Sequence, residues 1–142
     1  MVVPQLLANP NLPVSFKKIL GIQIDVVNYA SACDRIRSLA QPNQSHYIIA
    51  ANVHVVMTAY WHSHYRKILE NASQVTPDGK PLVIGMRWLG AKNQPRVYGP
   101  DLMLAWCEHA QQSGLSIYLY GSSPETLHKL SVNLKQTFPY LC

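Results

Sequence analysis

Residues 47–79 read YIIAANVHVVMTAYWHSHYRKILENASQVTPDG, and this stretch decides the fold class. Its first five residues form a continuous apolar run, which is typical of a strand covered on both faces. Residues 53–72 then space their apolar side chains as a long amphipathic helix does, and residues 74–76 form a second short strand. A strand, a helix and a strand joined by short loops predict a βαβ unit with parallel strands.

The alternation of strands and helices continues on both sides of this unit. Residues 18–26 alternate around Gly21, which predicts a short strand pair or one bent strand, and Asn28 can cap a helix over 30–39. Further helices are expected over 81–89, 101–113 and 125–138, with a strand over 115–120. The prediction is an α/β, Rossmann-like three-layer αβα fold with a mostly parallel sheet, which binds ligands at the carboxyl ends of its strands.

Composition predicts a compact domain. The chain has 142 residues, of which 48% are hydrophobic and 13% are charged; the charged share is about half the usual one, which excludes intrinsic disorder. No apolar run reaches the roughly 18 residues that a transmembrane helix needs, so any membrane contact is expected to be peripheral. Residues 1–16, with several prolines, are expected to form a flexible leader rather than a signal peptide, and residues 17–142 one α/β domain in the cytosol.

Charge and cysteine usage restrict the partners. Twelve Lys and Arg against seven Asp and Glu give a net charge of +5, which favours anionic partners such as nucleotides, diphosphates or an acidic membrane face. The basic residues are dispersed rather than interleaved with aromatic ones, so nucleic acid is not an expected partner. Three distant cysteines without a CxxC pair, and histidines without ligand spacing, predict neither a disulfide framework nor a metal site.

Three predicted strand ends carry the candidate functional residues. Asn52 ends the first strand, and it either caps the following helix or orients a hydroxyl or phosphate at that helix N-terminus. Asp78 follows the second strand, as a general base that accepts a proton from an attacking hydroxyl or as an ordinary turn aspartate. The third end offers small residues, hydroxyls and free amides as a phosphate cradle, unless its last serine is a plain helix cap: Gly121, Ser122 and Ser123.

Side chains between these strand ends have two interpretations each. Arg96 lies three residues before Gly99 and either clamps a diphosphate through its planar fork or pairs with Asp101 as a solvated loop arginine. The three tryptophans fall at helical positions, which favours core or interface roles over sugar stacking.

Taken together, several segments resemble a known family. Asn52 stands before a long helix, and four blocks follow in a fixed order: residues 76–83 (TPDGKPLV), 87–90 (RWLG), 96–102 (RVYGPDL) and 115–125 (LSIYLYGSSPE). In order and spacing they resemble the WecG/TagA/CpsF glycosyltransferases, and the resemblance covers residues 17–142.

The resemblance implies an inverting, metal-independent transferase of cell-surface polysaccharide synthesis. It would move an N-acetylmannosamine-like sugar from a UDP-sugar to a polyprenyl-diphosphate-linked sugar at the cytosolic face of the plasma membrane, with no cofactor besides the donor substrate. By the matching motifs, Asp78 is the expected general base, Asn52 positions substrate and Arg96 belongs to the active-site pocket. The expected substrate-binding residues also include Gly79, Gly99, Asp101, Gly121, Ser122 and Ser123.

The sequence departs from the family pattern in two ways. Ala50 stands where many relatives carry a hydroxyl side chain, and the family's later region with its basic C-terminal appendage is missing, so a partial active site is expected. One alternative is a non-catalytic nucleotide- or diphosphate-binding fragment of the same fold. Another is an interaction protein with exposed apolar surface; we expect homo-oligomers because the last sheet edge and the helix over 125–138 lack cover.

Overall fold

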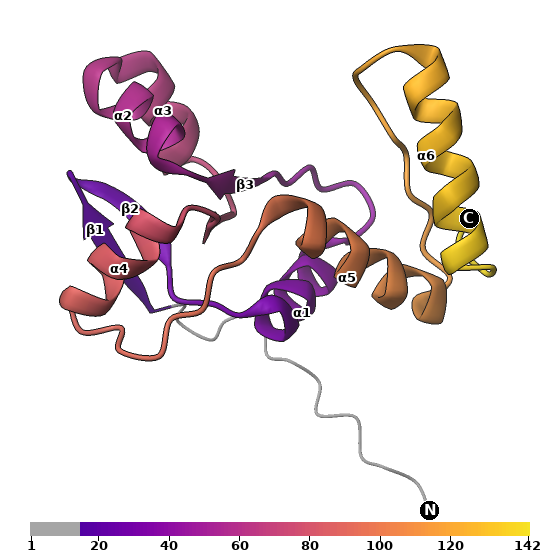
Figure 1. The fold of residues 1–142 in the computed structure, drawn as a ribbon, viewed down its shortest axis with the longest axis horizontal. Coiled ribbons are helices and arrows are strands. Elements are labelled where there is room, and N and C mark those ends of the chain that lie inside the picture. The colour runs from indigo at the N-terminus through magenta and orange to yellow at the C-terminus, as the bar shows by residue number, and fades with distance from the viewer. Residues whose placement is uncertain (1–14) are drawn as a thin grey trace, which may run out of the picture. The chain divides into compact units, whose positions relative to one another are not determined.

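The computed structural model describes residues 15–142, and the chain divides after Gly99 into two compact units, each of which is described by itself. Most of the predicted leader, residues 1–14, lies outside the described residues. The first strand begins at Phe16, one residue before the predicted domain boundary. Figure 1 labels the helices and strands.

The first unit opens with a β-hairpin. Strand β1 (Phe16–Ile19) pairs antiparallel with β2 (Ile22–Asp25). Leu20 and Gly21 form the two-residue turn with φ of 51° and 78°, the left-handed geometry that matches the twist of a hairpin and that Gly21 adopts without strain. Of the two predicted alternatives, the strand pair is confirmed.

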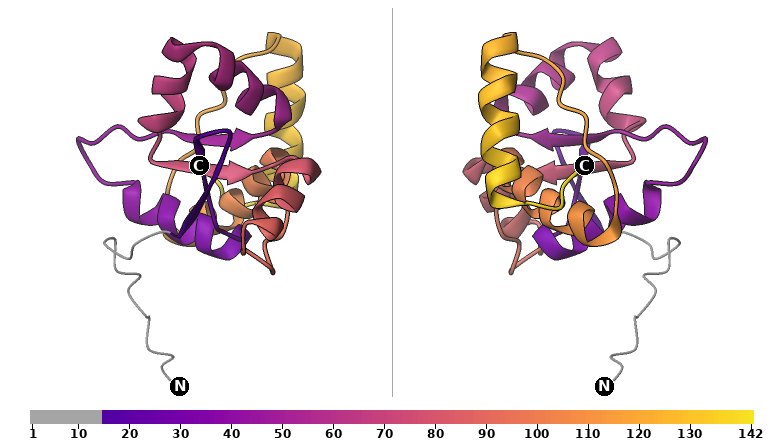
Figure 2. Two further views of the ribbon diagram at one scale, coloured as in Figure 1. Left: turned by 90° about the vertical axis from the view of Figure 1, so that its left-hand side faces the viewer. Right: turned by 90° about the vertical axis from the view of Figure 1, so that its right-hand side faces the viewer.

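The predicted parallel pair is present. Strand β3 (Ile48–Ala51) pairs parallel with β4 (Gln74–Pro77), in a register that places Ala51 opposite Pro77. In Figure 2 their two arrows lie side by side and point the same way. Their carboxyl ends therefore share one edge of the sheet.

The connection between these strands consists of two helices instead of the single helix predicted over 53–72. Helix α2 (Val53–Trp61) and helix α3 (Ser63–Glu70) are separated by His62, whose backbone is extended. The apolar face changes phase at this point: Val56 and Ala59 are buried in α2, whereas Leu69 is the buried residue of α3. In one straight helix these side chains would point in different directions. The break at His62 therefore lets both helices pack their apolar side chains into the same core.

Two more helices complete this unit. Helix α1 (Tyr29–Leu39) begins after Asn28, whose side chain accepts a hydrogen bond from the Ser31 amide, as the predicted cap should. Helix α4 (Lys80–Trp88) packs against β1. The core between the hairpin, the parallel pair and α2 to α4 contains Ile22, Ile24, Ala51, Val56, Ala59, Leu69, Val75, Leu82, Met86 and Ala91.

The second unit contains helix α6 (Pro124–Thr137) and helix α5 (Gly99–Ser113) from its second residue onward. The predicted strand over 115–120 is wrong, because this segment belongs to no ladder. Its alternation is nevertheless real: Ile117 and Leu119 pack on the core around Cys107, while Tyr118 and Tyr120 are 89% and 93% exposed. Alternation along the sequence predicts which side chains point inward, but a β-strand also requires a neighbouring strand with which its backbone forms hydrogen bonds.

The architecture is thus α/β, with one antiparallel and one parallel two-stranded sheet among the described residues. Within residues 15–142 no helix is long and apolar enough to cross a bilayer. Of the core and interface roles predicted for the tryptophans, the core role is wrong for Trp61 and Trp88, which are 66% and 86% exposed, whereas Trp106 of α5 is half-buried.

Candidate functional site

The shared edge of β3 and β4 brings Asn52 and Asp78 together. Each is the first residue after its strand, and the Asp78 amide donates to the Ala51 carbonyl at 2.9 Å, so the turn after β4 is bonded to the end of β3. Asn52 caps α2, its Oδ1 accepting from the Val55 amide at 3.0 Å. The cap interpretation of Asn52 is confirmed, and the cap places its side chain at the same sheet edge as Asp78.

Glycines let the backbone approach closely around these two residues. A Cβ on Gly79 would lie 3.4 Å from the Asn52 Cα, an ordinary contact distance. At Gly99 the space is tighter, because a Cβ there would be 3.2 Å from the Ala50 Cβ and 3.8 Å from Asp78 Oδ2. Of these two predicted substrate-binding residues, Gly99 therefore lies beside the Asp78 carboxylate and Gly79 lies beside Asn52.

Arg96 pairs with Asp78. Its Nη2 lies 3.0 Å from Asp78 Oδ1, and its Nε donates to the Asp78 carbonyl oxygen. The guanidinium also stacks 4.3 Å from the centre of the Tyr98 ring. The Asp78 side chain is 14% exposed and that of Arg96 is 41% exposed, so solvent reaches the pair mainly from the Arg96 side.

The paired Asp78 and Arg96 side chains offer a proton acceptor and a cationic donor next to each other. A carboxylate oxygen can accept a proton from a hydroxyl, and a guanidinium can donate to an anion. Among the described residues, Asp78 Oδ2 has no hydrogen-bond donor, whereas Oδ1 is engaged by Arg96. The Arg96 Nη1 is not used in its contacts with Asp78 and can donate to an anion. One open carboxylate oxygen and one remaining cationic donor suit proton abstraction next to an anionic leaving group.

The loop that carries Arg96 is anchored by residues that sequence reasoning missed. Gln94 is buried, and its side chain exchanges two hydrogen bonds with the Val27 backbone, accepting from N at 3.1 Å and donating to O at 2.5 Å. The Val97 amide donates to the Pro77 carbonyl at 2.8 Å. Tyr29 OH accepts from the Tyr98 amide at 3.0 Å. In sequence, Gln94 looks like any polar residue of a solvated loop, and no pattern marks it.

The third predicted strand end lies in the second unit. There Ser123 caps α6, its Oγ accepting from the Thr126 amide at 3.3 Å, which confirms the cap interpretation. Gly121 and Ser122 precede it with φ of 102° and 61°. Asp101 lies in the first turn of α5. The segment 121–123 follows no strand, so the sheet-edge argument does not join it to Asp78.

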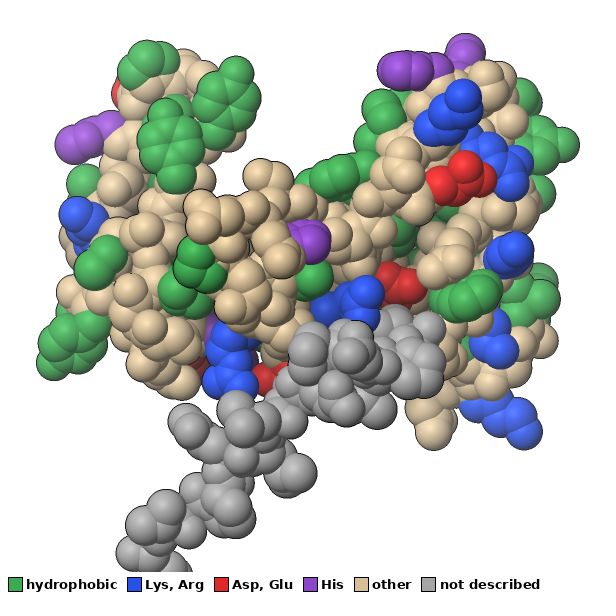
Figure 3. Space-filling model, turned by 180° about the vertical axis from the view of Figure 1, so that it is seen from behind, with side chains coloured by type: hydrophobic (Ala, Val, Ile, Leu, Met, Phe, Trp, Pro, Cys, Tyr) green, Lys and Arg blue, Asp and Glu red, His purple; other side chains and the backbone are tan. Residues whose placement is uncertain are grey.

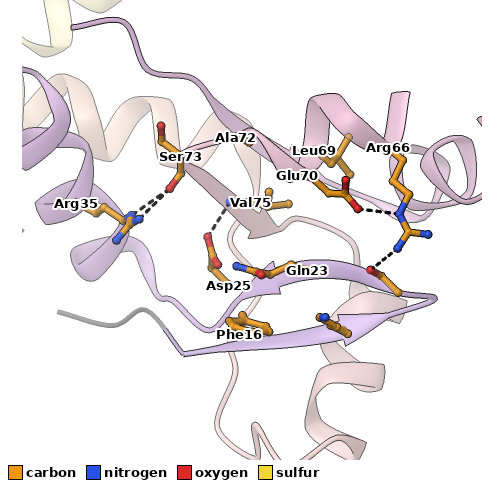
Figure 4. Close-up of a pocket in the computed structure, with 12 residues that line it drawn as sticks. Phe16, Gln23, Asp25, Arg35, Arg66, Leu69, Glu70, Ala72, Ser73 and Val75 are labelled. Atoms are coloured by element: carbon orange, nitrogen blue, oxygen red, sulfur yellow. Dashed lines mark hydrogen bonds and ion pairs between the residues drawn. The ribbon is translucent and has the colours of Figure 1, made fainter. Parts of the chain in front are cut away.

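A cavity of about 480 Å³ lies near the beginning of β4, away from the strand end that leads to Asp78. Figure 4 shows Asp25 from β2, Arg35 from α1 and Ser73 around it. The buried Asp25 accepts from the Val75 amide at 2.9 Å, and Arg35 donates to the Ser73 carbonyl. Burial raises the pKa of Asp25, although the Val75 amide, Gln23 and Arg35 each act to lower it. These bonds connect the hairpin and α1 to β4, a structural role.

Comparison with known proteins identifies the family of this chain. The sequence profile described as "Glycosyl transferase WecG/TagA/CpsF family" matches residues 17–142. Two relatives carry the name N-acetylglucosaminyldiphosphoundecaprenol N-acetyl-beta-D-mannosaminyltransferase. One is from Bacillus spizizenii, 26% identical over 97 residues that cover 68% of this chain and 38% of the relative. The other is from Staphylococcus aureus strain NCTC 8325, 24% identical over 123 residues that cover 85% and 48%.

The chain thus spans less than half the length of these relatives. The profile match nevertheless includes each strand end, the Asp78–Arg96 pair and both units. With the match extending over nearly the whole chain, this protein belongs to the WecG/TagA/CpsF family of glycosyltransferases.

Proposed function

We propose that the protein takes part in transferring an N-acetylmannosamine-like sugar from a UDP-sugar to a polyprenyl-diphosphate-linked sugar, with inversion and without a metal ion. The single observation that carries this proposal is the Asp78 carboxylate at the shared strand edge, next to Asn52 and held by Arg96. The names of the relatives support the lipid-diphosphate acceptor and the transferred sugar.

In the proposed reaction Asp78 Oδ2 takes the proton of the acceptor hydroxyl. The hydroxyl oxygen forms the new bond to the anomeric carbon from the face opposite the leaving group, and the bond from that carbon to the UDP oxygen breaks. UDP leaves with the electron pair. A positioned base of this kind contributes about 10²- to 10⁴-fold to rate.

In this proposal, cationic side chains and backbone amides stabilise the negative charge of the departing UDP. Arg96 offers its remaining Nη1. The N-termini of α2 and α4 begin at Val53 and Lys80, directly after the two strand ends, and helix N-termini favour anions. Asn52 Oδ1 accepts the hydrogen bond from the Val55 amide that caps α2, so the side-chain nitrogen of Asn52 can donate to a substrate hydroxyl.

We further propose the setting that this reaction requires. A lipid-linked acceptor implies peripheral association with the cytosolic membrane face, and the parallel β3–β4 pair with its helical connection is compatible with a Rossmann-like three-layer fold. The exposed alternate side chains of residues 115–120 support self-association.

The test is transfer from UDP-N-acetylmannosamine to a lipid-diphosphate-N-acetylglucosamine analogue, in this chain and in the longest reading frame that contains it. Asp78→Asn is expected to lower kcat by at least about 100-fold with UDP binding retained. Glu125→Gln is the matched control, because this carboxylate is 77% exposed on α6 and should leave transfer unchanged. Undiminished transfer by Asp78→Asn would refute the base role. UDP binding without turnover in either protein would select the non-catalytic alternative.

A further inference from the structure

Beyond its N-terminus, which the proposed site uses, helix α4 presents an apolar and basic outer face to solvent. Leu82, Val83 and Met86 of this helix are buried, whereas the opposite side is exposed to solvent. We call this exposed side and its flanking lysine the α4 surface, and it consists of Lys80, Ile84, Arg87, Trp88, Leu89 and Lys92.

The exposure of the apolar residues on the α4 surface is unusually high. Trp88 is 86% exposed, Leu89 50% and Ile84 47%. Ile84 and Trp88 are four residues apart, so they lie one above the other on the same side of the helix. Three large apolar side chains grouped in this way indicate an interaction surface rather than isolated exposed residues.

The charge around these residues has one sign. Residues 79–100 contain four Lys and Arg and no Asp or Glu. The Lys17 ammonium of β1 adds to this charge, since its Nζ would lie 3.7 Å from a Cβ on Gly90. Asp78, the acidic residue just before this stretch, is paired with Arg96. Figure 3, the view from behind Figure 1, shows hydrophobic and basic side chains without acidic ones at its lower right, on the side of the first unit where the β1–β2 hairpin lies.

We infer that the α4 surface is where the protein docks on an anionic bilayer, with Trp88 and Leu89 entering the interface and the lysines contacting lipid phosphates. Tryptophan prefers the interfacial zone of a membrane, and long basic side chains reach the headgroups while their stems lie along apolar surface. Anionic lipids attract cations near the surface by about a fivefold gain in binding for each Lys or Arg. The α4 surface carries basic residues without acidic ones. An anionic bilayer would attract this positive charge, whereas a protein partner with a neutral surface would not.

The position of the surface suits the proposed reaction, on which this inference rests. Helix α4 begins at Lys80, two residues after Asp78, and its nine residues extend about 14 Å at 1.5 Å per residue. The loop after α4 returns to Arg96, which contacts Asp78. A bilayer on the α4 surface would thus lie alongside the site that is to receive a lipid-linked diphosphate.

The experiment is co-sedimentation of the 142-residue chain with vesicles of phosphatidylglycerol and phosphatidylcholine, compared with vesicles of phosphatidylcholine alone. We expect binding that needs phosphatidylglycerol and weakens with salt. Trp88→Ser should lower the partition coefficient about tenfold or more, given the apolar area of an indole. Its matched control is Trp61→Ser, because Trp61 is also exposed, at 66%. Lys92→Gln should lower binding about fivefold, and Lys67→Gln on α3 should not.

A second readout locates the contact. Vesicles with brominated acyl chains should quench the tryptophan fluorescence of the wild-type chain and of Trp61→Phe, but much less that of Trp88→Phe. Absence of binding to anionic vesicles would overturn the inference, as would equal losses in the Trp61 and Trp88 variants. It would also be overturned if Trp88→Ser dissociated an oligomer in sedimentation equilibrium while vesicle binding persisted.

Failure here is distinguishable from failure of the proposed function. Vesicle binding requires no donor sugar, so Asp78→Asn should still bind phosphatidylglycerol vesicles, and Trp88→Ser should weaken that binding in the Asp78→Asn background as well. Asp78-dependent transfer without vesicle binding through Trp88 would remove the docking surface and leave the proposed function in place. Vesicle binding through Trp88, together with transfer that does not depend on Asp78, would leave the docking surface in place and remove the base role of Asp78 from the proposed function.

Discussion

Replacing Gln94 with alanine should loosen the loop that holds Arg96 against Asp78. The Gln94 side chain is buried, and it accepts from the Val27 amide at 3.1 Å and donates to the Val27 carbonyl at 2.5 Å. It also donates to the Pro95 carbonyl at 2.7 Å. Alanine can replace none of these bonds.

The magnitude follows from the two Val27 groups. A buried donor or acceptor left without a partner costs about 1 to 3 kcal/mol, so the Gln94→Ala variant should lose about 2 to 6 kcal/mol of unfolding free energy in the first unit. The lower end applies if water enters the vacated space. One tenfold change in an equilibrium constant corresponds to about 1.4 kcal/mol, so amide exchange at Val27 should accelerate at least about tenfold.

The assay is hydrogen–deuterium exchange resolved by residue, together with urea unfolding. Exchange should also accelerate at Val97, whose amide bonds to the Pro77 carbonyl at 2.8 Å in the same loop. The matched control is Asn93→Ala, because this neighbour is exposed and a surface change typically stays within about 0.5 kcal/mol. Equal destabilisation by Asn93→Ala, or unchanged exchange at Val27 and Val97, would refute the anchoring role of Gln94.

Three further predictions test burial and packing. Burial raises the pKa of Asp25 above 3.8, so the folded state holds this proton more tightly than the unfolded state does. The stability that this gives is complete below pH 3.8 and is lost as the pH rises through the pKa of the folded state. In urea titrations, Asp25→Asn should therefore raise the free energy of unfolding at pH 7, and this gain should vanish below pH 3.8. Burial also raises the pKa of Cys33 to about 11, so iodoacetamide at pH 8 should alkylate the exposed Cys142 far faster; equal labelling in mass spectrometry would contradict this. Gly99→Ala places a Cβ 3.2 Å from β3 and should cost about 1 to 3 kcal/mol in thermal unfolding. The Gly79→Ala control, whose Cβ meets ordinary contact distances, should cost less.

Local sequence patterns predicted most elements of the first unit. The apolar run before Asn52 and the spacing of apolar residues in the helices reflect periods that a single segment carries by itself. Caps were equally local: Asn28, Asn52 and Ser123 each bond an amide three residues ahead. The single helix over 53–72 was wrong because its break depends on which side chains face the core, and that depends on β2.

For the candidate site, the sequence indicated the residues but not their contacts. Asp78, Asn52 and Arg96 were predicted from strand ends and from the family resemblance, and the structure brings them to one edge. The sequence offered Asp101 as a partner for Arg96, whereas the structure pairs Arg96 with Asp78, 18 residues away in the chain. Gln94 was missed because its partner, Val27, is 67 residues away.

The sequence by itself determined the helices apart from the break at His62, their N-terminal caps, the parallel strand pair and the family. Each of these follows from residues within a few positions of one another or from a motif in fixed order. The tertiary structure alone decided that Arg96 holds Asp78, that Asp25 bonds to β4, that residues 115–120 form no strand and that Trp88 is exposed. These features depend on which surfaces meet after folding, and hydrogen bonding and burial between distant segments leave no period in the sequence.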